Sequence, residues 1–223
     1  DRCNKNVVTS PWDPLPELEV PLAEFITQKW APNGGHLGEK VAMIDATTGL
    51  QRTFADYHDI MKRVGAALKN ELGVGLDSTV ALYSPNHVDY LPISLAVSLC
   101  GAKLTPTNPM FTSYELRNIL NRSRSSVLIA HKSKLDVALE AAKQSEHVKH
   151  VIVLSDSDGK EAVPEGSIDL ASLKTYDGSF LVDTPTHVKD NVKTHPFLLP
   201  YSSGTTGLPK GVCLTHHNIV TNL

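Results

Sequence analysis

The 223-residue chain has few cysteines, and their arrangement excludes several kinds of site. Cys3, Cys100 and Cys213 are far apart, so the sequence contains no C-x-x-C pair of the kind that thioredoxin-like or zinc-binding motifs require. An odd and sparse set of cysteines is typical of a reducing compartment rather than of a disulfide-stapled secreted domain. We therefore expect a cytoplasmic protein.

Long apolar runs and a strong charge of one sign are also missing. The most apolar uncharged run, Tyr90–Ala102, is shorter than the ~20 residues that cross a bilayer, and it contains Pro92. We expect a buried helix there and no membrane span, and the first residues form no signal peptide. The formal net charge of −3 gives no electrostatic reason to expect nucleic acid as a partner.

The apolar pattern predicts an α/β fold. With 41% apolar and 20% charged residues, the chain has the composition of a globular protein with a real core. From residue 79 onward, short Val/Ile/Leu-rich strands alternate with helices of about 10–13 residues, which favours a mostly parallel sheet with helices on both faces. The predicted strands are 80–83, 103–105, 127–130 and 151–154, and the predicted helices are 88–100, 113–122 and 135–143.

The flanking segments suggest how the chain is divided. Prolines punctuate residues 1–20, which we expect to form an extended arm. Residues 21–194 are expected to form one α/β subdomain. It begins with a helix at Pro21 and a hairpin over 41–54, and Thr53 and Asp56 then resemble a capping box.

We interpret residues 155–194 as a connecting surface segment with one short helix near Leu170–Leu173. Residues 195–223 are expected to begin the next subdomain. Thr215–Val220 has the pattern of a capped helix that is just starting, so we expect the sequence to be the N-terminal piece of a longer protein, with a C-terminal domain absent. His216 and His217 are expected to be cap and early-helix residues rather than catalytic bases.

The most distinctive segment is a loop rich in glycine and hydroxyl groups, which a predicted strand over 197–201 enters and a predicted strand over 212–214 leaves. Glycines allow the tight turns that bring backbone N–H groups onto a phosphate, hydroxyls add short donors, and a lysine adds charge. Pro209 stiffens the approach to that lysine. The predicted phosphate-binding residues are Ser202, Ser203, Gly204, Thr205, Thr206, Gly207 and Lys210.

This loop differs from the two best-known nucleotide-binding motifs. A Walker A loop has four residues between its first glycine and Gly-Lys, with Ser or Thr next, whereas Lys210 lies between Pro209 and Gly211. No G-x-G-x-x-G fingerprint is present either.

The stretch Tyr201–Val212 resembles the ATP-phosphate signature of the adenylate-forming superfamily at every position. Two further stretches add to the resemblance. Ser84-Pro85-Asn86, followed by a helix ending in Cys100-Gly101-Ala102, resembles the early core of that family. Thr107–Leu116 is similar to the NP-x-[FY]-T-x-x-E-[LI] segment of 4-coumarate:CoA ligases and their firefly-luciferase-like relatives.

The resemblance implies a two-step reaction that uses ATP, Mg²⁺ and coenzyme A. A small-molecule carboxylic acid would form an acyl-adenylate, and the CoA thiol would then displace AMP. In the family, the catalytic lysine and the acidic metal ligand belong to later segments, so we expect no catalytic and no metal-binding residue in this chain, and no ligase activity from it alone. A peroxisomal location stays open, because its signal would lie at the end of a longer protein. The oligomeric state is open as well.

The sequence leaves several questions of function open. The acid could be phenolic, fatty or luciferin-like, the enzyme could instead load a carrier protein, and a catalytically dead scaffold of the same fold is the non-enzyme alternative. Among other residues, Cys100 is expected in the core, and Asp156 and Asp158 in a solvated turn. Tyr83, Asn86 and Asn108 lie near predicted strand ends, where ligands often bind, but structural roles are favoured.

Overall fold

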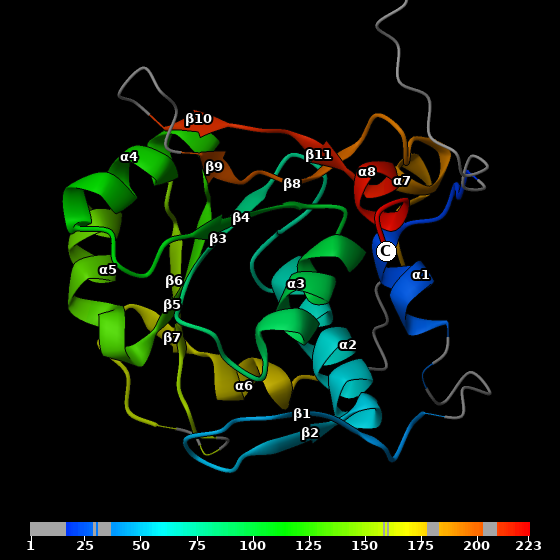
Figure 1. The fold of residues 1–223 in the computed structure, drawn as a ribbon. Coiled ribbons are helices and arrows are strands. Elements are labelled where there is room, and N and C mark those ends of the chain that lie inside the picture. Colours follow the sequence, from blue (N-terminus) through cyan, green and yellow to red (C-terminus); the bar gives the residue numbers. More distant parts are fainter. Residues whose placement is uncertain are drawn as a thin grey trace, which may run out of the picture.

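The computed structural model describes residues 17–28, 30, 37–157, 159, 161–177, 183–202 and 209–223. Its centre is a seven-stranded sheet with the order β11-β8-β4-β3-β5-β6-β7 (Figure 1). All neighbouring strands are parallel except β8 and β11, which are antiparallel. The strands are β3 (Thr79–Tyr83), β4 (Lys103–Thr107), β5 (Val127–His131), β6 (His150–Leu154), β7 (Ser167–Asp169), β8 (Pro196–Leu198) and β11 (Leu214–Thr215).

Helices cover both faces of this sheet, as the alternation of strands and helices predicted. On β3, Val80 and Leu82 pack into a core formed with α2 and α3, whereas Ala81 and Tyr83 pack into a second core on the side of α4 and α5. Successive side chains of a strand point to opposite faces, so one strand supplies both cores. The long helices are α2 (Phe54–Asn70), α3 (Tyr90–Leu99), α4 (Ser113–Ser123) and α5 (Leu135–Lys143), and a 3₁₀ turn at Lys132–Lys134 precedes α5.

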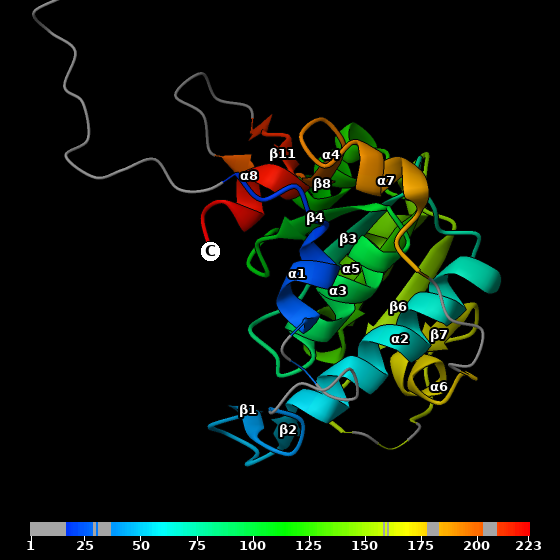
Figure 2. The same ribbon diagram turned by 90° about the vertical axis from the view of Figure 1, so that its right-hand side faces the viewer.

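The predicted N-terminal elements are present, although the arm over 1–20 lies mostly outside the described residues. Helix α1 (Leu22–Thr27) starts after Pro21, and the capping box of Thr53 and Asp56 begins α2. Strands β1 (Val41–Ile44) and β2 (Gln51–Thr53) form a separate hairpin, which Figure 2 shows beside the start of α2 and apart from the main sheet.

The segment 155–194 contains more regular structure than expected. Helix α6 (Leu170–Lys174) lies where a short helix was predicted, but β7 also extends the sheet beyond β6, and α7 (Thr186–Asp190) follows. A three-residue edge strand is too short to show the period-2 pattern that identifies a strand.

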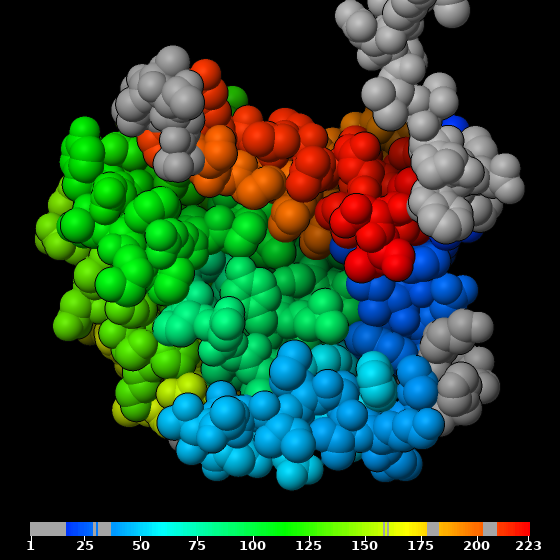
Figure 3. Space-filling model, viewed as in Figure 1, coloured from blue at the N-terminus to red at the C-terminus, as the bar shows by residue number. Residues whose placement is uncertain are grey.

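The last helix of the described chain packs against the first described helix. Helix α8 (His216–Val220) starts with a capping box formed by Thr215 and Asn218, and it lies beside α1, as the adjoining red and blue surfaces in Figure 3 show. The ring of His216 is fully buried, and its Nδ1 accepts a hydrogen bond from the backbone N–H of Leu22 at 3.2 Å. His216 is therefore an early-helix core residue, in line with the expectation. A subdomain boundary at residue 195 stays a prediction, and β8 and β11 are hydrogen-bonded into the main sheet.

Candidate functional site

The ends of the predicted phosphate loop form a β-hairpin. Strand β9 (Tyr201–Ser202) pairs antiparallel with β10 (Lys210–Gly211), so that Lys210 stands opposite Ser202. Side chains of directly opposed residues point to the same face of an antiparallel pair, with Cβ atoms ~5 Å apart. Ser202 and Lys210, the two ends of the predicted phosphate set, thus share one face, and both are exposed.

The hairpin corrects two predicted strands. The expected strand over 197–201 is interrupted, because β8 ends at Leu198 and β9 begins at Tyr201. Pro200 has no N–H to give to a ladder, and its carbonyl accepts from the N–H of Val212 at 2.9 Å. The expected strand over 212–214 is likewise wrong in its start, since Lys210–Gly211 and Leu214–Thr215 are the paired segments.

The middle of the loop, Ser203, Gly204, Thr205, Thr206, Gly207 and Leu208, lies outside the described residues. Phosphate binding by these residues and by Ser202 and Lys210 stays a prediction.

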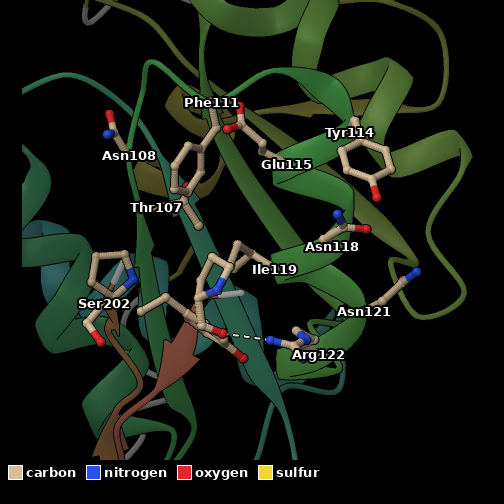
Figure 4. A pocket seen from close by; sticks show the side chains of 13 residues that line it. Thr107, Asn108, Phe111, Tyr114, Glu115, Asn118, Ile119, Asn121, Arg122 and Ser202 are labelled. Carbon is tan, nitrogen blue, oxygen red and sulfur yellow. Dashed lines mark hydrogen bonds between the residues drawn. The ribbon is translucent and has the colours of Figure 1, made fainter. Parts of the chain in front are cut away.

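A cavity of about 770 Å³ lies between the hairpin and the turn from β4 into α4 (Figure 4). It lies at the carboxyl end of β4, whose last residues Pro106 and Thr107 line it, and open α/β sheets bind their ligands at this edge. Its volume falls in the usual range for small-molecule sites. It is lined by Pro106, Thr107, Asn108, Phe111, Tyr114, Glu115, Asn118, Ile119, Asn121, Arg122, Tyr201, Ser202 and Pro209.

The turn from β4 into α4 is built by local hydrogen bonds. The side chain of Asn108 accepts from the N–H of Met110 at 2.9 Å, and Thr112 and Glu115 form a capping box. Hydrogen bonds from Thr112 to the Glu115 carboxylate lower the pKa of that carboxyl. The polar residues of the Thr107–Leu116 segment thus fix where α4 begins, which agrees with the structural role expected for Asn108.

Helix α4 supplies one wall of the cavity. Tyr114, Asn118 and Arg122 follow one another at four-residue spacing, so they lie on one face of the helix, and all three line the cavity. Arg122 reaches across to the hairpin, where its Nη1 donates to the carbonyl oxygen of Pro209 at 2.6 Å, the dashed line in Figure 4. Sequence reasoning missed Arg122, because its partner lies 87 residues further along the chain.

On the other face of the hairpin, Tyr201 packs against Gly211 and also lines the cavity. Tyr201 pairs with Gly211, and a Cβ added to Gly211 would lie 3.2 Å from two atoms of the tyrosine ring. Burial raises the pKa of Tyr201 above its ordinary value. Gly211 therefore lets the ring of Tyr201 approach the second strand closely.

A second group of side chains meets at the ends of β3, β5 and β6. The ring nitrogens of His87 and His131 approach the carboxylate of Asp156, and the three ligand atoms lie within 4.8 Å of one another. Backbone N–H groups of Asp89 and Ser133 donate to Nδ1 of the two rings, at 3.0 and 3.2 Å.

Each neutral ring of this group therefore carries its proton on Nε2, the nitrogen that faces Asp156. A metal-bound histidine needs the opposite arrangement, with its free nitrogen donating outward. The cluster is thus suited to hold Asp156 in place and poorly suited to a cation, and Asp158 lies outside the described residues.

Two of the remaining candidates, Cys100 and Tyr83, have structural roles. Cys100 is buried, its thiol donates to the carbonyl oxygen of Gly65 at 3.3 Å, and burial raises its pKa to about 12, so it is a core residue as expected. Tyr83 is buried and its hydroxyl donates to Phe111 O at 2.7 Å, whereas Asn86 is exposed. In the described part of the chain, no helix combines the length and apolarity needed to span a membrane.

Comparison with known proteins identifies relatives over most of the chain. The family described as "AMP-binding enzyme" matches residues 30–223. A 4-coumarate–CoA ligase 1 of Arabidopsis thaliana is 33% identical over 215 residues, covering 94% of this chain and 36% of its own length. A luciferin 4-monooxygenase of Luciola mingrelica is 31% identical over 220 residues, covering 97% of this chain and 39% of its own. The chain thus spans little more than a third of these relatives.

Solved structures agree with the fold. A long-chain-fatty-acid-CoA ligase from Archaeoglobus fulgidus superposes with a TM-score of 0.78 and 26% identity, covering 96% of this chain and 40% of that one. An anthranilate CoA ligase in complex with anthranoyl-AMP gives a TM-score of 0.75 at 23% identity, covering 91% and 36%. The mostly parallel α/β architecture is therefore that of the corresponding part of acyl-CoA ligases.

Proposed function

Because this chain belongs to the AMP-binding family of adenylate-forming enzymes, we propose that the protein it comes from is an ATP-dependent carboxylic acid:CoA ligase. In the first step, a carboxylate oxygen attacks the α-phosphate of ATP, and the bond to the β-phosphate breaks to release pyrophosphate. In the second step, the CoA thiol attacks the acyl carbon, loses its proton and displaces AMP.

The pairing of Ser202 with Lys210 is the observation that carries this proposal. Ser202 lines the cavity of about 770 Å³, and Lys210 stands directly opposite Ser202 on the same face of the hairpin. A hydroxyl and an ammonium so placed can hold the β- and γ-phosphates and offset the charge of the departing pyrophosphate. The loop residues between them, Ser203 to Gly207, would add backbone and hydroxyl donors.

Metal and CoA binding rest on the family alone. Among the described residues that line the cavity, Glu115 is the one carboxylate, and its Oε2 accepts both hydrogen bonds from Thr112 in the capping box. A single carboxylate with one oxygen already used is a poor fit for an ion that takes about six oxygen ligands, and we expect Mg²⁺ to arrive on the ATP phosphates.

The substrate that we propose is a hydroxycinnamate-like acid, since several relatives at about 30% identity bear the name 4-coumarate–CoA ligase. A fatty acid is the second candidate, because a similar solved structure is a long-chain-fatty-acid-CoA ligase. A luciferin-like acid, a carrier-protein substrate and a non-catalytic scaffold are the remaining candidates.

The test is a pyrophosphate-release screen of the full-length protein against hydroxycinnamic, benzoic and fatty acids, with and without CoA. Pyrophosphate release with one acid class, together with a CoA-dependent thioester, would support the ligase proposal and name the substrate. Pyrophosphate release without any thioester would favour carrier loading. No release with any acid would overturn the proposal.

A further inference from the structure

We infer that Arg122 is a positioning residue, which sets the direction of Lys210 by holding the peptide group before it. Arg122 belongs to the last turn of α4, and its Nη1 donates to the carbonyl oxygen of Pro209 at 2.6 Å. This inference rests on the proposed function for its catalytic consequence, but the contact itself is independent of it.

The link from Arg122 to Lys210 follows from peptide geometry. The carbonyl of Pro209 and the N–H and Cα of Lys210 lie in one rigid plane. A hydrogen bond that fixes the carbonyl oxygen therefore fixes the peptide plane. The plane contains the N–Cα bond of Lys210, and the lysine side chain branches from that Cα. Pro209 adds a fixed φ on the other side of the same plane.

Helix α4 is a firm base for this contact. Leu116, Ile119 and Leu120 bury its inner face, and the capping box of Thr112 and Glu115 fixes its start. At the other end, Ser123 donates to the carbonyl of Ile119 at 2.7 Å. Arg122 is exposed on the outer face, so the contact costs little burial, and its planar guanidinium holds a carbonyl in a defined direction.

The hairpin needs such a support on the side of Lys210. Strands β9 and β10 are two residues long each, and an isolated two-stranded hairpin is marginally stable. Within the described residues, the packing of Tyr201 on Gly211 and the bond from Val212 to Pro200 hold the far end of the pair. Arg122 acts at the near end, beside the loop.

The experiment uses the full-length protein with Arg122→Met, Arg122→Lys, Lys210→Ala and the double variant Arg122→Met/Lys210→Ala. Arg122→Met should lower kcat for pyrophosphate release by about 10- to 100-fold, since a misplaced group loses that much, with KM for the acid unchanged. Arg122→Lys, which keeps a charged donor, should recover part of the rate. In the Lys210→Ala background, Arg122→Met should lower kcat by less than about twofold. Both changes act on the same contact, that of the Lys210 ammonium with the ATP phosphates, and it is already lost in this background.

Arg117→Met is the matched control, since Arg117 lies on the same helix but contacts the Tyr114 ring rather than the hairpin. Independent losses that multiply in the double variant would overturn the inference, as would an unchanged rate in Arg122→Met. Amide hydrogen exchange of residues 210–212 gives a readout that needs no activity, and it should speed up in Arg122→Met and not in Arg117→Met. If the wild-type protein released no pyrophosphate, the proposed function would fail, and unchanged exchange in Arg122→Met would overturn the inference separately.

Discussion

At the scale of single residues, Lys210 has the largest part in the proposed reaction, because its ammonium would offset the charge of the departing pyrophosphate. It is exposed and forms part of a two-residue strand, so its removal should leave the core intact. In the full-length protein, we expect Lys210→Ala to reduce acid-dependent pyrophosphate release by at least about 100-fold, as the loss of one transition-state donor does, with an unchanged Tm.

Lys189→Ala, a change of an exposed lysine that pairs with Glu24 at 2.9 Å, is the control for Lys210→Ala. An unchanged rate of pyrophosphate release in Lys210→Ala would remove Lys210 from the phosphate set.

At Gly101 the backbone conformation and the close neighbours require glycine. Its φ of +70° lies in the left-handed region, and a Cβ there would meet Leu76 at 2.9 Å, Pro185 at 3.0 Å and Val188 at 3.1 Å. Gly101→Ala should therefore cost about 2–5 kcal/mol in the free energy of unfolding, from backbone strain and overpacking together.

Gly73→Ala separates the two costs of the Gly101 change. Gly73 has a φ of +64° and no heavy atom within 4 Å of the added Cβ, so that variant should lose about 1–2 kcal/mol. Urea unfolding measures both variants, and equal losses would show that packing around Gly101 relaxes freely.

His216 makes stability depend on pH. Burial and the neighbouring His195 lower its pKa from 6.5 to about 4, and its ring stacks on that of His195 at 5.9 Å. Between pH 6.5 and 4, His216 binds a proton in the unfolded chain but stays neutral in the folded chain. Its contribution to stability is therefore fully present above pH 6.5 and falls on acidification. The loss approaches ~3 kcal/mol near pH 4, at 1.36 kcal/mol per unit of pKa shift.

Urea unfolding at a series of pH values measures this slope. His216→Gln removes the titrating group and should flatten the curve between pH 6.5 and 4. The same series on His187→Gln is the control, because His187 is an exposed ring that packs edge-on against His195 at 5.6 Å. An unchanged slope in His216→Gln would assign the acid sensitivity to other groups.

At the scale of the elements, one buried carboxylate joins β2, α3 and α6. Asp89 is fully buried at the start of α3. It accepts from Arg52 Nε at 2.7 Å and Nη2 at 3.2 Å, and it pairs with Lys174. Burial raises the pKa of Asp89, but the hydrogen bond from Arg52 and the charges of Lys174 and Arg52 together hold it below its ordinary value.

Replacing this carboxylate should therefore be costly. Asp89→Asn removes the negative charge that pairs with Arg52 and Lys174, and it leaves these two cations in poorly hydrated surroundings. We therefore expect a loss of about 3–5 kcal/mol in the free energy of unfolding. Asp59→Asn removes the exposed Asp59–Arg63 pair and should cost under about 1 kcal/mol. Similar losses in the two variants would contradict the role given to Asp89.

The success of sequence reasoning follows the range of the interactions at this scale. The capping boxes of Thr53 with Asp56 and of Thr215 with Asn218 span three residues each, so the sequence predicts the start of α2 and α8. The long strands and helices follow from apolar periodicity in the same way. By contrast, β7 and the two short strands of the hairpin have no periodicity to read.

The phosphate loop stays a prediction from local chemistry, whereas the geometry of the cavity beside it cannot be read from the sequence. Glycines, hydroxyls and a lysine in this order predict a phosphate loop from local sequence alone. The contact of Arg122 with Pro209 joins residues 87 apart, and the cavity walls come from two separate segments. Such contacts depend on the order of strands in the sheet, which local patterns do not encode.

At the scale of the whole molecule, we propose that the chain supplies the phosphate-binding side of a larger site. It covers 36% of the length of the 4-coumarate–CoA ligase 1 of Arabidopsis thaliana, and among the described residues the cavity has one carboxylate, Glu115, whose Oε2 is used by the capping box. We therefore expect the 223-residue chain alone to form no acyl-AMP or acyl-CoA.

Mass spectrometry after incubation with ATP, Mg²⁺, CoA and the best acid checks this expectation, with the full-length protein as the positive control. Turnover by the isolated chain would show that the catalytic groups lie within it.

The contact between α1 and α8 has a consequence for the chain as it leaves the ribosome. Leu22 and His216 are 194 residues apart, and at about 5–20 residues per second the second appears roughly 10–40 s after the first. During that interval Leu22 and Ala23, which are buried in the finished core, lack the side of their pocket that α8 supplies. Helix α1 is thus covered only after α8 has been synthesised, 194 residues later.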